Sequence, residues 1–362
     1  MQDYPDEILD LSPKAQAWQE YDERTETWAP VPSADETSLP TDLKESVGVG
    51  VGVGSGSPSL VLATWNVNYI GPRPGARLDA IFSHMVDHAP PPDIIFFQEV
   101  SRPMIGSLLC RDEVRRGWYS SERDSANWIS AFATVILLSK ARFGPAAAGT
   151  SPSPRPCAVV LGRLARIRYP SMMRRDALCG DIFVPTTRAD ASSTATPRYV
   201  RVGLVNVHLE SRNLPESASY RAGQLSVAAS MLRRTGRGLV AGDFNPVDAR
   251  DESVVEDNGL RDAWTELRGA EAGCTWGVDG RARYPAARMD KVATLGLRPL
   301  HIQVMHPQKL SLPGPSAPGA TSSHRVGLGD GSGNTQEPTA WSDHSGLKFT
   351  FELDSWNGDE SG

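Results

Sequence analysis

The residues most able to do chemistry are polar side chains that stand at or just beyond the ends of apolar, β-prone runs. Open α/β sheets bind ligands in the crevice at the carboxyl ends of their strands, so side chains gathered there can form one site. Taken singly these residues say little, because an Asn after a strand is usually a turn former. Eight such positions recur along the chain: Asn66, Glu99, His208, Asp243, Asn245, Asp290, Asp343 and His344.

The types of these side chains suit the hydrolysis of a phosphodiester. A hard divalent cation such as Mg²⁺ prefers carboxylate oxygens, and Glu99 offers one directly after a buried run. Asp243 and Asn245 are two residues apart, so they point the same way from an extended segment. His344 follows Asp343, which can orient it or raise its pKa. Together they could bind a metal, position water and hold phosphoryl oxygens.

These positions require strands that converge on one edge of a sheet. Residues 60–67 form an apolar, β-prone run, residues 76–88 carry a helical apolar stripe, and residues 93–100 read DIIFFQEV, a buried strand. The order strand, helix, strand indicates α/β layers. A long helix is predicted at 216–234, and further strands at 132–139, 158–167, 179–184, 199–209, 238–242, 291–295, 301–305 and 347–353.

The chain divides into an acidic N-terminal segment and one large domain. Residues 1–58 include the low-complexity run VGVGVGVGSGS, and we expect them to be a disordered tail and linker, with docking of the segment around Trp18 and Trp28 as the alternative. The catalytic domain is predicted at 59–355, followed by a flexible C-terminus at 356–362. Pro-, Gly- and Ser-rich loop insertions are predicted at about 144–156, 185–197 and 307–339.

Charge and composition permit a phosphate-rich ligand. The net charge of the chain is −6, but residues 1–58 hold twelve acidic and three basic residues, so the remainder carries +3. The chain contains no run of about eighteen apolar residues, so the sequence predicts no membrane span. The four cysteines contain no CxxC pair that would indicate a zinc site, and we expect them to be reduced in an intracellular protein.

The order of the short motifs closely resembles the endonuclease/exonuclease/phosphatase superfamily. The resemblance covers residues 60–353, and its combined pattern is highly specific. It implies a four-layer α/β sandwich, in which two packed β-sheets are flanked by helices. The motifs are TWN (64–66), QEV (98–100), NVHLES (206–211), GDFN (242–245), RMDK (288–291) and SDH (342–344).

The resemblance implies a metal site. Glu99 would be the direct ligand of Mg²⁺, with Mn²⁺ as a possible substitute. Asn66 would lie at the metal, and Asp343 would support the metal site and the neighbouring His344.

The resemblance also implies roles in the reaction. Asp243 would orient or deprotonate the attacking water, and Asn245 would contact the phosphate. His208 and His344 would hold phosphoryl oxygens in the transition state, and Asp290 would support the metal site and His344.

Within the superfamily the chain looks most like the tyrosyl-DNA phosphodiesterase 2 branch, which removes a tyrosyl adduct from a 5′ DNA phosphate. TWN opens that branch, HLES (208–211) is followed by YRAGQL (220–225), and Thr275-Trp276 precedes an RxD motif. The expected partner is therefore DNA with a peptide or tyrosyl adduct at its 5′ end. Substrate-binding roles would fall to Ser211, Arg212, Arg221, Trp276 and Arg288.

Two departures concern the substrate. The branch usually carries an arginine two residues after the GDxN asparagine, where this chain has Val247. The arginine after HLES is also displaced, with Arg212 next to the expected place and Asn213 in it. Arg212 and Arg221 could supply the missing positive charge, because both follow the predicted His208 strand.

Other functions remain open at this stage. The same chemistry could act on RNA, abasic DNA or a phosphorylated small molecule. A catalytically silent binding module is the alternative of another class, although the intact set of carboxylates and histidines argues against it. A DNA-end role implies the nucleus, with the cytoplasm as the alternative, and protein partners of the N-terminal segment are left open.

Overall fold

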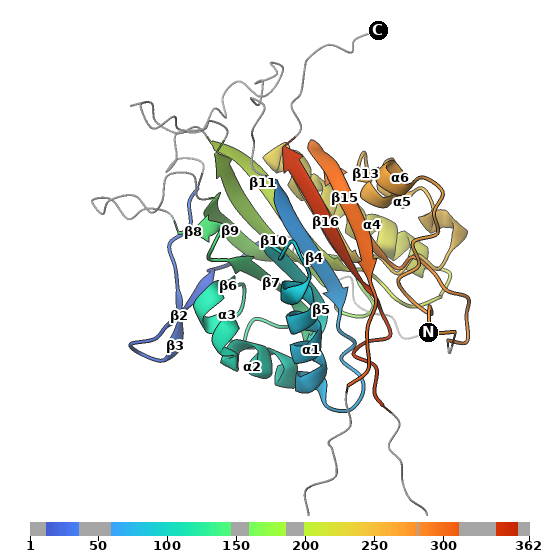
Figure 1. Cartoon of the computed structure of the whole chain (residues 1–362). Helices are drawn as coiled ribbons and strands as arrows, with labels where there is room; N and C mark the ends of the chain where they lie inside the picture. Colours follow the sequence, from blue (N-terminus) through green and yellow to red (C-terminus); the bar gives the residue numbers. More distant parts are fainter. Residues whose placement is uncertain are drawn as a thin grey trace, which may run out of the picture.

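The computed structural model describes residues 12–35, 59–145, 159–185, 199–280, 282–310 and 338–353. The described chain forms two β-sheets that lie face to face, with helices on both outer sides (Figure 1). The three predicted loop insertions lie almost wholly outside the described residues. The Gly-rich linker and the C-terminus at 356–362 lie entirely outside them.

The first sheet runs in the order β1-β9-β10-β11-β12-β14-β13, with β8 beside β9. Its central pair, β11 and β12, is parallel, so both strands end at the same edge. The strands are β1 (Lys14–Gln16), β8 (Phe143–Gly144), β9 (Val159–Arg168), β10 (Asp176–Pro185), β11 (Tyr199–His208), β12 (Gly238–Asp243), β13 (Arg261–Asp262) and β14 (Asp290–Leu295).

The second sheet runs in the order β15-β16-β4-β5-β7-β6-β2-β3. Its central pair, β4 and β5, is also parallel and ends at the same edge of the molecule. The strands are β2 (Gln19–Asp22), β3 (Thr27–Pro30), β4 (Leu60–Asn66), β5 (Ile94–Ser101), β6 (Trp118–Ser120), β7 (Phe132–Ser139), β15 (Leu297–Met305) and β16 (Gly346–Leu353).

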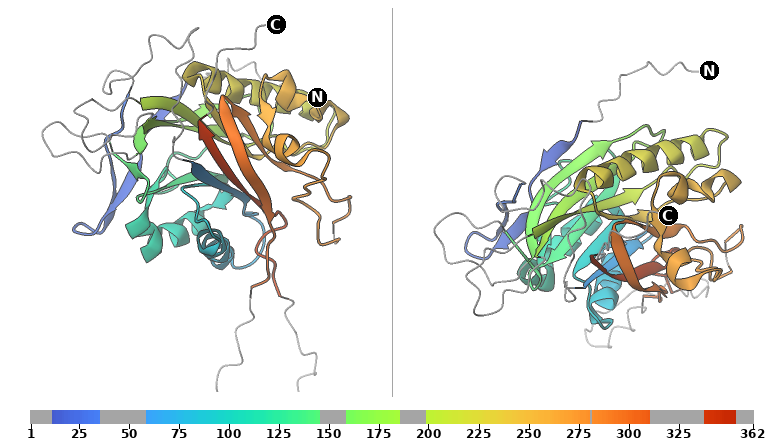
Figure 2. Two further views of the ribbon diagram at one scale, coloured as in Figure 1. Left: turned by 45° about the horizontal axis from the view of Figure 1, so that its top comes forward. Right: turned by 90° about the horizontal axis from the view of Figure 1, so that it is seen from above.

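Helices complete the four layers. One apolar cluster fills the space between the sheets, a second joins α1, α2 and α3 to the second sheet, and a third joins α4 and α5 to the first. Figure 2 (right) shows α4 and α1 on opposite sides of the paired sheets. The predicted four-layer α/β sandwich is therefore confirmed. The helices are α1 (Pro74–Asp87), α2 (Arg102–Cys110), α3 (Asp112–Gly117), α4 (Ser217–Thr235), the 3₁₀ turn η1 (Ala249–Asp251), α5 (Val254–Asp257) and α6 (Ala263–Arg268).

None of the helices in the described part of the chain is long and apolar enough to cross a membrane.

The prediction of disorder is wrong for residues 12–35, which we call the N-terminal clasp. Its strand β1 pairs with β9 of the first sheet, and its strand β2 pairs with β6 of the second. Trp18 between them is fully buried in the core between the sheets, and its Nε1 donates to the carbonyl of Gly162 at 2.9 Å. Gly180 makes room for the indole, because a Cβ there would lie 2.9 Å from its ring. The segment thus belongs to the fold.

Candidate active site

Strand ends from both sheets bring the predicted site residues together. Asn66 ends β4 and Glu99 lies near the end of β5, while His208 and Asp243 end the parallel strands β11 and β12. The amide of Asn66 donates to Asp243 Oδ2 at 2.9 Å and to Glu99 Oε1 at 3.3 Å. One buried asparagine of the second sheet therefore orients a carboxylate from each sheet.

The local backbone is shaped to aim these side chains. The register between β5 and β7 shifts between Phe97 and Val100, and Glu99 within that irregularity has a φ of 60°. A positive φ is costly for a residue with a side chain and is often found at functional sites. Glu99 is held there by the backbone N–H of Tyr69, which donates to Oε2 at 3.0 Å. Asn245 has a φ of 47° and donates its own backbone N–H to Asp243 Oδ1 at 2.9 Å.

The close approach of β11 and β12 also positions the site residues at their ends. A side chain on Gly242 would collide with the carbonyl oxygen of Val207, and the φ of this glycine is 135°. Only glycine fits there without strain. The next pair in the register is His208 and Asp243, so this contact sets the two catalytic candidates side by side.

A buried arginine determines the protonation of His208. Arg175 donates from Nη1 to His208 Nδ1 at 2.6 Å, which leaves the proton of a neutral imidazole on Nε2. Burial and the adjacent Arg175 cation hold the pKa of His208 well below its usual range. Its Nε2 lies 3.7 Å from Glu99 Oε1 and 3.5 Å from Asp243 Oδ2. His208 is therefore a neutral donor that points into the site.

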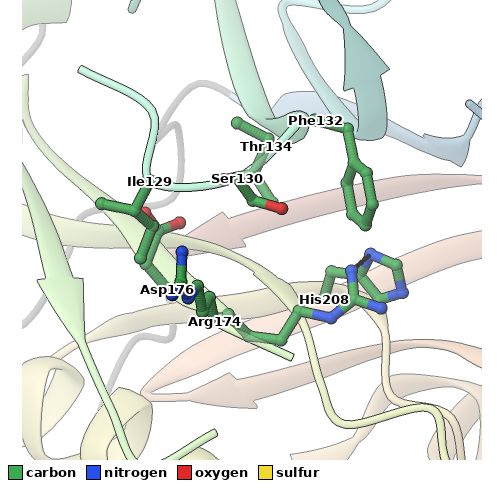
Figure 3. Close-up of a pocket in the computed structure, with 9 residues that line it drawn as sticks. Ile129, Ser130, Phe132, Thr134, Arg174, Asp176 and His208 are labelled. Carbon is green, nitrogen blue, oxygen red and sulfur yellow. Dashed lines mark hydrogen bonds between the residues drawn. The ribbon is translucent and has the colours of Figure 1, made fainter. Parts of the chain in front are cut away.

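Arg175 was not predicted from the sequence, because it precedes β10 in a segment without a motif. Its guanidinium lies over the Phe132 ring, 4.9 Å from the ring centroid. Phe132 in turn lies beside His208 (Figure 3), with 6.0 Å between the two ring centroids. These side chains line a small pocket with Thr134, Arg174 and Asp176. The pocket fixes both the position and the tautomer of His208.

His344 has the opposite charge state. Its Nδ1 contacts Asp290 Oδ2 at 2.8 Å, and its Nε2 lies 3.8 Å from Asp243 Oδ2. Burial opposes a charge on the ring, but Asp290 and Asp243 outweigh it and raise the pKa of His344 to about 10. Ligand atoms of these three residues lie within 4.8 Å of one another, a spacing that a metal could use. Without a cation there, the imidazolium paired with Asp290 acts as a hydrogen-bond donor toward Asp243.

Contacts between motifs position His344. The hydroxyl of Ser342 donates to the backbone oxygen of Asn66 at 2.6 Å and accepts from the backbone N–H of His344. The indole of Trp65 donates to the backbone oxygen of His344 at 2.9 Å. The TWN motif thereby holds the SDH motif.

The donor set suits a divalent cation at Glu99. Its side chain is 16% exposed, whereas that of Asp243 is 2% exposed, so Glu99 can be reached from solvent. Burial raises the pKa of Asp243 to about 7, despite the opposing charge of His344. The carboxylates of Glu99 and Asp243 share the Asn66 amide, and neither forms an ion pair with a Lys or Arg among the described residues. Such carboxylates are hard oxygen donors of the kind that Mg²⁺ binds.

Asp343 does not join this pair. Its carboxylate is exposed and accepts from Trp276 Nε1 at 3.2 Å. No hydrogen bond or ion pair links it to Asn66 or Glu99 in the described part of the chain. Its role at the metal remains a prediction, and its observed contact is with a predicted substrate-binding residue.

Arg221 is a correction to the predicted substrate-binding set. Its side chain is 2% exposed and makes a bidentate pair with Asp251 at 2.8 and 2.7 Å. Its Nη1 donates to the backbone oxygen of Glu210 at 3.0 Å. The guanidinium ties α4 to the segment after β11 and to η1, so it cannot also hold a substrate phosphate.

The other predicted substrate-binding residues lie around a groove that opens from Asn245 and His344. Ser211, Trp276 and Arg288 line this groove, as does Val247 at the position of the absent arginine. Arg212 is exposed and does not line it. Three of the five predicted contacts are therefore brought together next to the catalytic candidates.

A second buried arginine that sequence reasoning missed organises the loop after β4. Arg77 of α1 is 1% exposed and donates from Nη1 to the backbone oxygens of Val67 and Trp341. Its Nη2 donates to the oxygens of Asn68 and Ile70. The loop that it holds supplies the Tyr69 N–H to Glu99, so Arg77 positions the metal ligand indirectly.

A polar bridge joins the sheets directly below the site. Gln98 Nε2 donates to Asn206 Oδ1 at 2.8 Å, and Asn206 Nδ2 donates to the backbone oxygens of Phe97 and Val135 at 3.1 and 2.9 Å. Both side chains are fully buried. Gln98 and Asn206 belong to the QEV and NVHLES motifs, so both lie in segments that the sequence marks as important. Within those motifs, catalytic roles were predicted only for Glu99 and His208.

The fold and the site together define a class of proteins: α/β-sandwich phosphoesterases with an acidic site whose residues suit a divalent metal. In agreement, the model of the Endonuclease/Exonuclease/phosphatase family matches residues 63–344, and the chain belongs to this family. Members of the family hydrolyse phosphate esters and generally use divalent metals, so the protein is a phosphoester hydrolase.

Solved structures agree on the fold. A humanized D. rerio TDP2 (tyrosyl-DNA phosphodiesterase 2) is 20% identical with a TM-score of 0.55, covering 82% of this chain and 99% of that one. The same values apply to D. rerio TDP2 complexed with single strand DNA product. An endonuclease/exonuclease/phosphatase from Bacteroides vulgatus is 14% identical with a TM-score of 0.51, covering 82% and 100%. A comparison with curated protein sequences finds no match.

Proposed function

We propose that the protein is a Mg²⁺-dependent phosphodiesterase that hydrolyses 5′-phosphotyrosyl ends of DNA, with Mn²⁺ able to replace Mg²⁺. The observation that carries the reaction is the arrangement around Asp243, whose Oδ2 lies 3.5 Å from the neutral His208 and 3.8 Å from the cationic His344. A carboxylate flanked by two donors suits attack by water on a phosphorus atom whose oxygens need stabilisation.

Each side chain has a distinct task in this proposal. Glu99, oriented by Asn66, would hold the metal, which would neutralise charge on the phosphate when bound. Asp243 orients the water and accepts its proton as the water oxygen bonds to phosphorus. The bond from phosphorus to the tyrosyl oxygen breaks, and tyrosine leaves as a phenolate that takes a proton from solvent. His208 donates from Nε2 and His344 donates as an imidazolium to phosphoryl oxygens. Because the site is buried, these donors act in a low dielectric and need no reorganisation during the reaction.

DNA ends are favoured as the substrate by the HLES, TW and RxD motifs and by the similarity to the fold of TDP2, one structure of which contains a single strand DNA product. The side-chain amide of Asn245 has two N–H groups. One donates to the Leu209 carbonyl at 3.2 Å, so the other can donate to the phosphate. A DNA-end substrate would place the protein in the nucleus. RNA, abasic DNA and phosphorylated small molecules are the competing substrates.

The decisive test offers the full chain several substrates in parallel. These are 5′-tyrosyl DNA, abasic DNA, RNA and an inositol phosphate, each with Mg²⁺, with Mn²⁺ and with a chelator. We expect the highest kcat/KM on 5′-tyrosyl DNA with Mg²⁺ and no turnover with the chelator. Preference for another phosphodiester would reject the DNA-end assignment and leave the reaction class in place.

A variant tests the metal ligand itself. Glu99→Gln removes the charge that holds the cation and should lower kcat/KM by on the order of 10³-fold, with unchanged thermal unfolding. The matched control is Glu113→Gln, since Glu113 is an exposed carboxylate of α3 that pairs with Arg111. Near-normal metal-dependent turnover by a folded Glu99→Gln protein would show that Glu99 is not the metal ligand.

A further inference from the structure

Two cations in the groove share a single carboxylate. Arg288 donates from Nη1 to both oxygens of Asp262 at 2.9 and 2.7 Å, and Lys291 Nζ lies 3.7 Å from the same carboxylate. The side chain of Asp262 is 3% exposed, that of Lys291 7% and that of Arg288 20%. Both cations line the groove that reaches Asn245 and His344. Two cations share one buried carboxylate, so the cluster of Arg288, Lys291 and Asp262 carries a net positive charge that is largely shielded from water. Glu256 lies further out and also attracts Lys291.

Residues 246–252 also line the groove and offer no lysine or arginine to it. Val247 stands there in place of the expected arginine. Of the acids in this segment, Asp248 pairs with Arg250 and Asp251 pairs with Arg221. The third acid, Glu252, is exposed, so water and salt screen its charge. Compensated acids repel an anion only weakly, whereas a partly desolvated pair of cations attracts one strongly. An anionic strand in the groove would therefore lie against Arg288 and Lys291.

We propose that Arg288 and Lys291 form a subsite for a second backbone phosphate, next to the scissile one, and so take the part of the missing arginine. This inference rests on the proposed function, since it presumes a strand with successive phosphates. Both hydrogen bonds that the structure gives Arg288 come from Nη1, so Nη2 can face a ligand. Such a subsite favours a nucleic-acid strand over a substrate with a single phosphate.

Asp262 holds this subsite ready. Its Oδ1 also accepts from the backbone N–H groups of Trp264 and Thr265 in the first turn of α6, so the carboxylate is fixed before substrate arrives. Asp262→Asn would keep the oxygen that caps the helix, because Asn is an equally good N-cap. The change would remove the negative charge that competes with phosphate. Variants that should strengthen phosphate binding and variants that should weaken it can therefore both be made.

The test compares two substrates with the same leaving group. One is the p-nitrophenyl ester of thymidine 5′-phosphate, which has a single phosphodiester. The other is a single-stranded oligonucleotide with the same ester at its 5′ end. The measured quantity is the ratio of kcat/KM on the oligonucleotide to kcat/KM on the mononucleotide, for wild type and for Arg288→Gln, Lys291→Gln and Asp262→Asn.

We expect Arg288→Gln and Lys291→Gln each to lower this ratio about tenfold or more, the usual effect of losing a charge-assisted contact. Asp262→Asn should raise the ratio. The salt dependence of kcat/KM on the oligonucleotide should weaken by about 0.7 in log–log slope for each cation removed. The matched control is Arg298→Gln, because Arg298 pairs with Glu352 outside the groove, and it should leave the ratio unchanged.

Several outcomes would overturn the subsite. Equal losses on both substrates would mean that the cations only maintain structure, and an unchanged ratio would mean that no second phosphate is bound. If wild type hydrolyses neither ester, the proposed function fails, and binding decides the subsite separately. Fluorescence anisotropy of a 5′-phosphorylated oligonucleotide, with nucleoside 5′-monophosphate as competitor, should then still show weaker binding for Lys291→Gln. Unchanged binding would reject the subsite.

Discussion

At the scale of single residues, the two histidines of the site show how neighbours determine chemistry. His208 meets a guanidinium and stays neutral, while His344 meets two carboxylates and stays charged. One site thus holds a neutral donor and a cationic donor made from the same residue type. A phosphoryl group between them would gain charge stabilisation mainly from the His344 side.

This difference predicts the alkaline pH dependence. The carboxylates raise the pKa of His344 to about 10, so the imidazolium is present below that pH and lost above it. Asp290→Asn removes a raising charge, and the alkaline limb of the kcat/KM–pH profile should therefore move to lower pH. Asp343→Asn is the graded control and should move it less, since Asp343 makes the smaller contribution. An alkaline limb that stays in place in Asp290→Asn would show that another group titrates there.

The catalytic candidates could be predicted from the sequence, but the arginines could not. Asn66, Glu99 and Asp243 follow apolar runs, and the ends of buried strands converge by the geometry of the fold. An arginine has no such positional signal. Arg221 forms an ion pair with Asp251, and Arg175 donates to His208. In each case the partner lies 30 residues or more away along the chain, so only the folded structure shows the pair.

At the scale of elements, the apolar strands and the long amphipathic helices could be predicted and the N-terminal clasp could not. Residues 60–66, 94–101 and 217–235 form elements close to the predicted bounds. β1 is the edge strand of the first sheet, and β2 lies next to β3, the edge strand of the second. Both are short and polar, and only Trp18 between them enters the core. A single buried indole among charged residues gives no periodicity to detect.

The clasp should nevertheless contribute strongly to stability. Trp18→Ala should lower the free energy of unfolding by about 3–5 kcal/mol, because it leaves a cavity between the sheets and removes the bond to Gly162. Trp28→Ala should cost less, since Trp28 is only half-buried. Urea unfolding of the full chain measures both. A Trp18→Ala protein as stable as wild type would show that the clasp is dispensable.

At the scale of the whole molecule, the site exists only where two sheets meet. The second sheet supplies Asn66 and Glu99, and the first supplies His208, Asp243 and Asp290. Catalytic distances therefore depend on how the sheets are packed, and the bridge between Gln98 and Asn206 fixes that packing where it matters most. Enzymes are sensitive to displacements of about 1 Å in such positions.

Loss of the bridge should affect both stability and rate. Asn206→Leu leaves the Gln98 amide and two backbone carbonyls without their partner, which should cost about 2 kcal/mol or more in the free energy of unfolding. The kcat should fall about tenfold with little change in KM, since Gln98 adjoins Glu99. Gln98→Leu with Asn206→Leu should cost less than the two single losses summed. Strict additivity of the two changes would contradict the bridge.

The two-sheet pairing of the clasp has a consequence for how the chain is made. Lys14 pairs with Arg166 and Gln19 pairs with Ser120, so these strands gain their partners only after a long stretch of further chain has left the ribosome. At about 5–20 residues per second, that delay is roughly 5–20 s for β2 and roughly 8–30 s for β1. During it, Trp18 has no core to enter. The residues of the clasp are thus translated early, and they can pair with both sheets only after those later residues have been made.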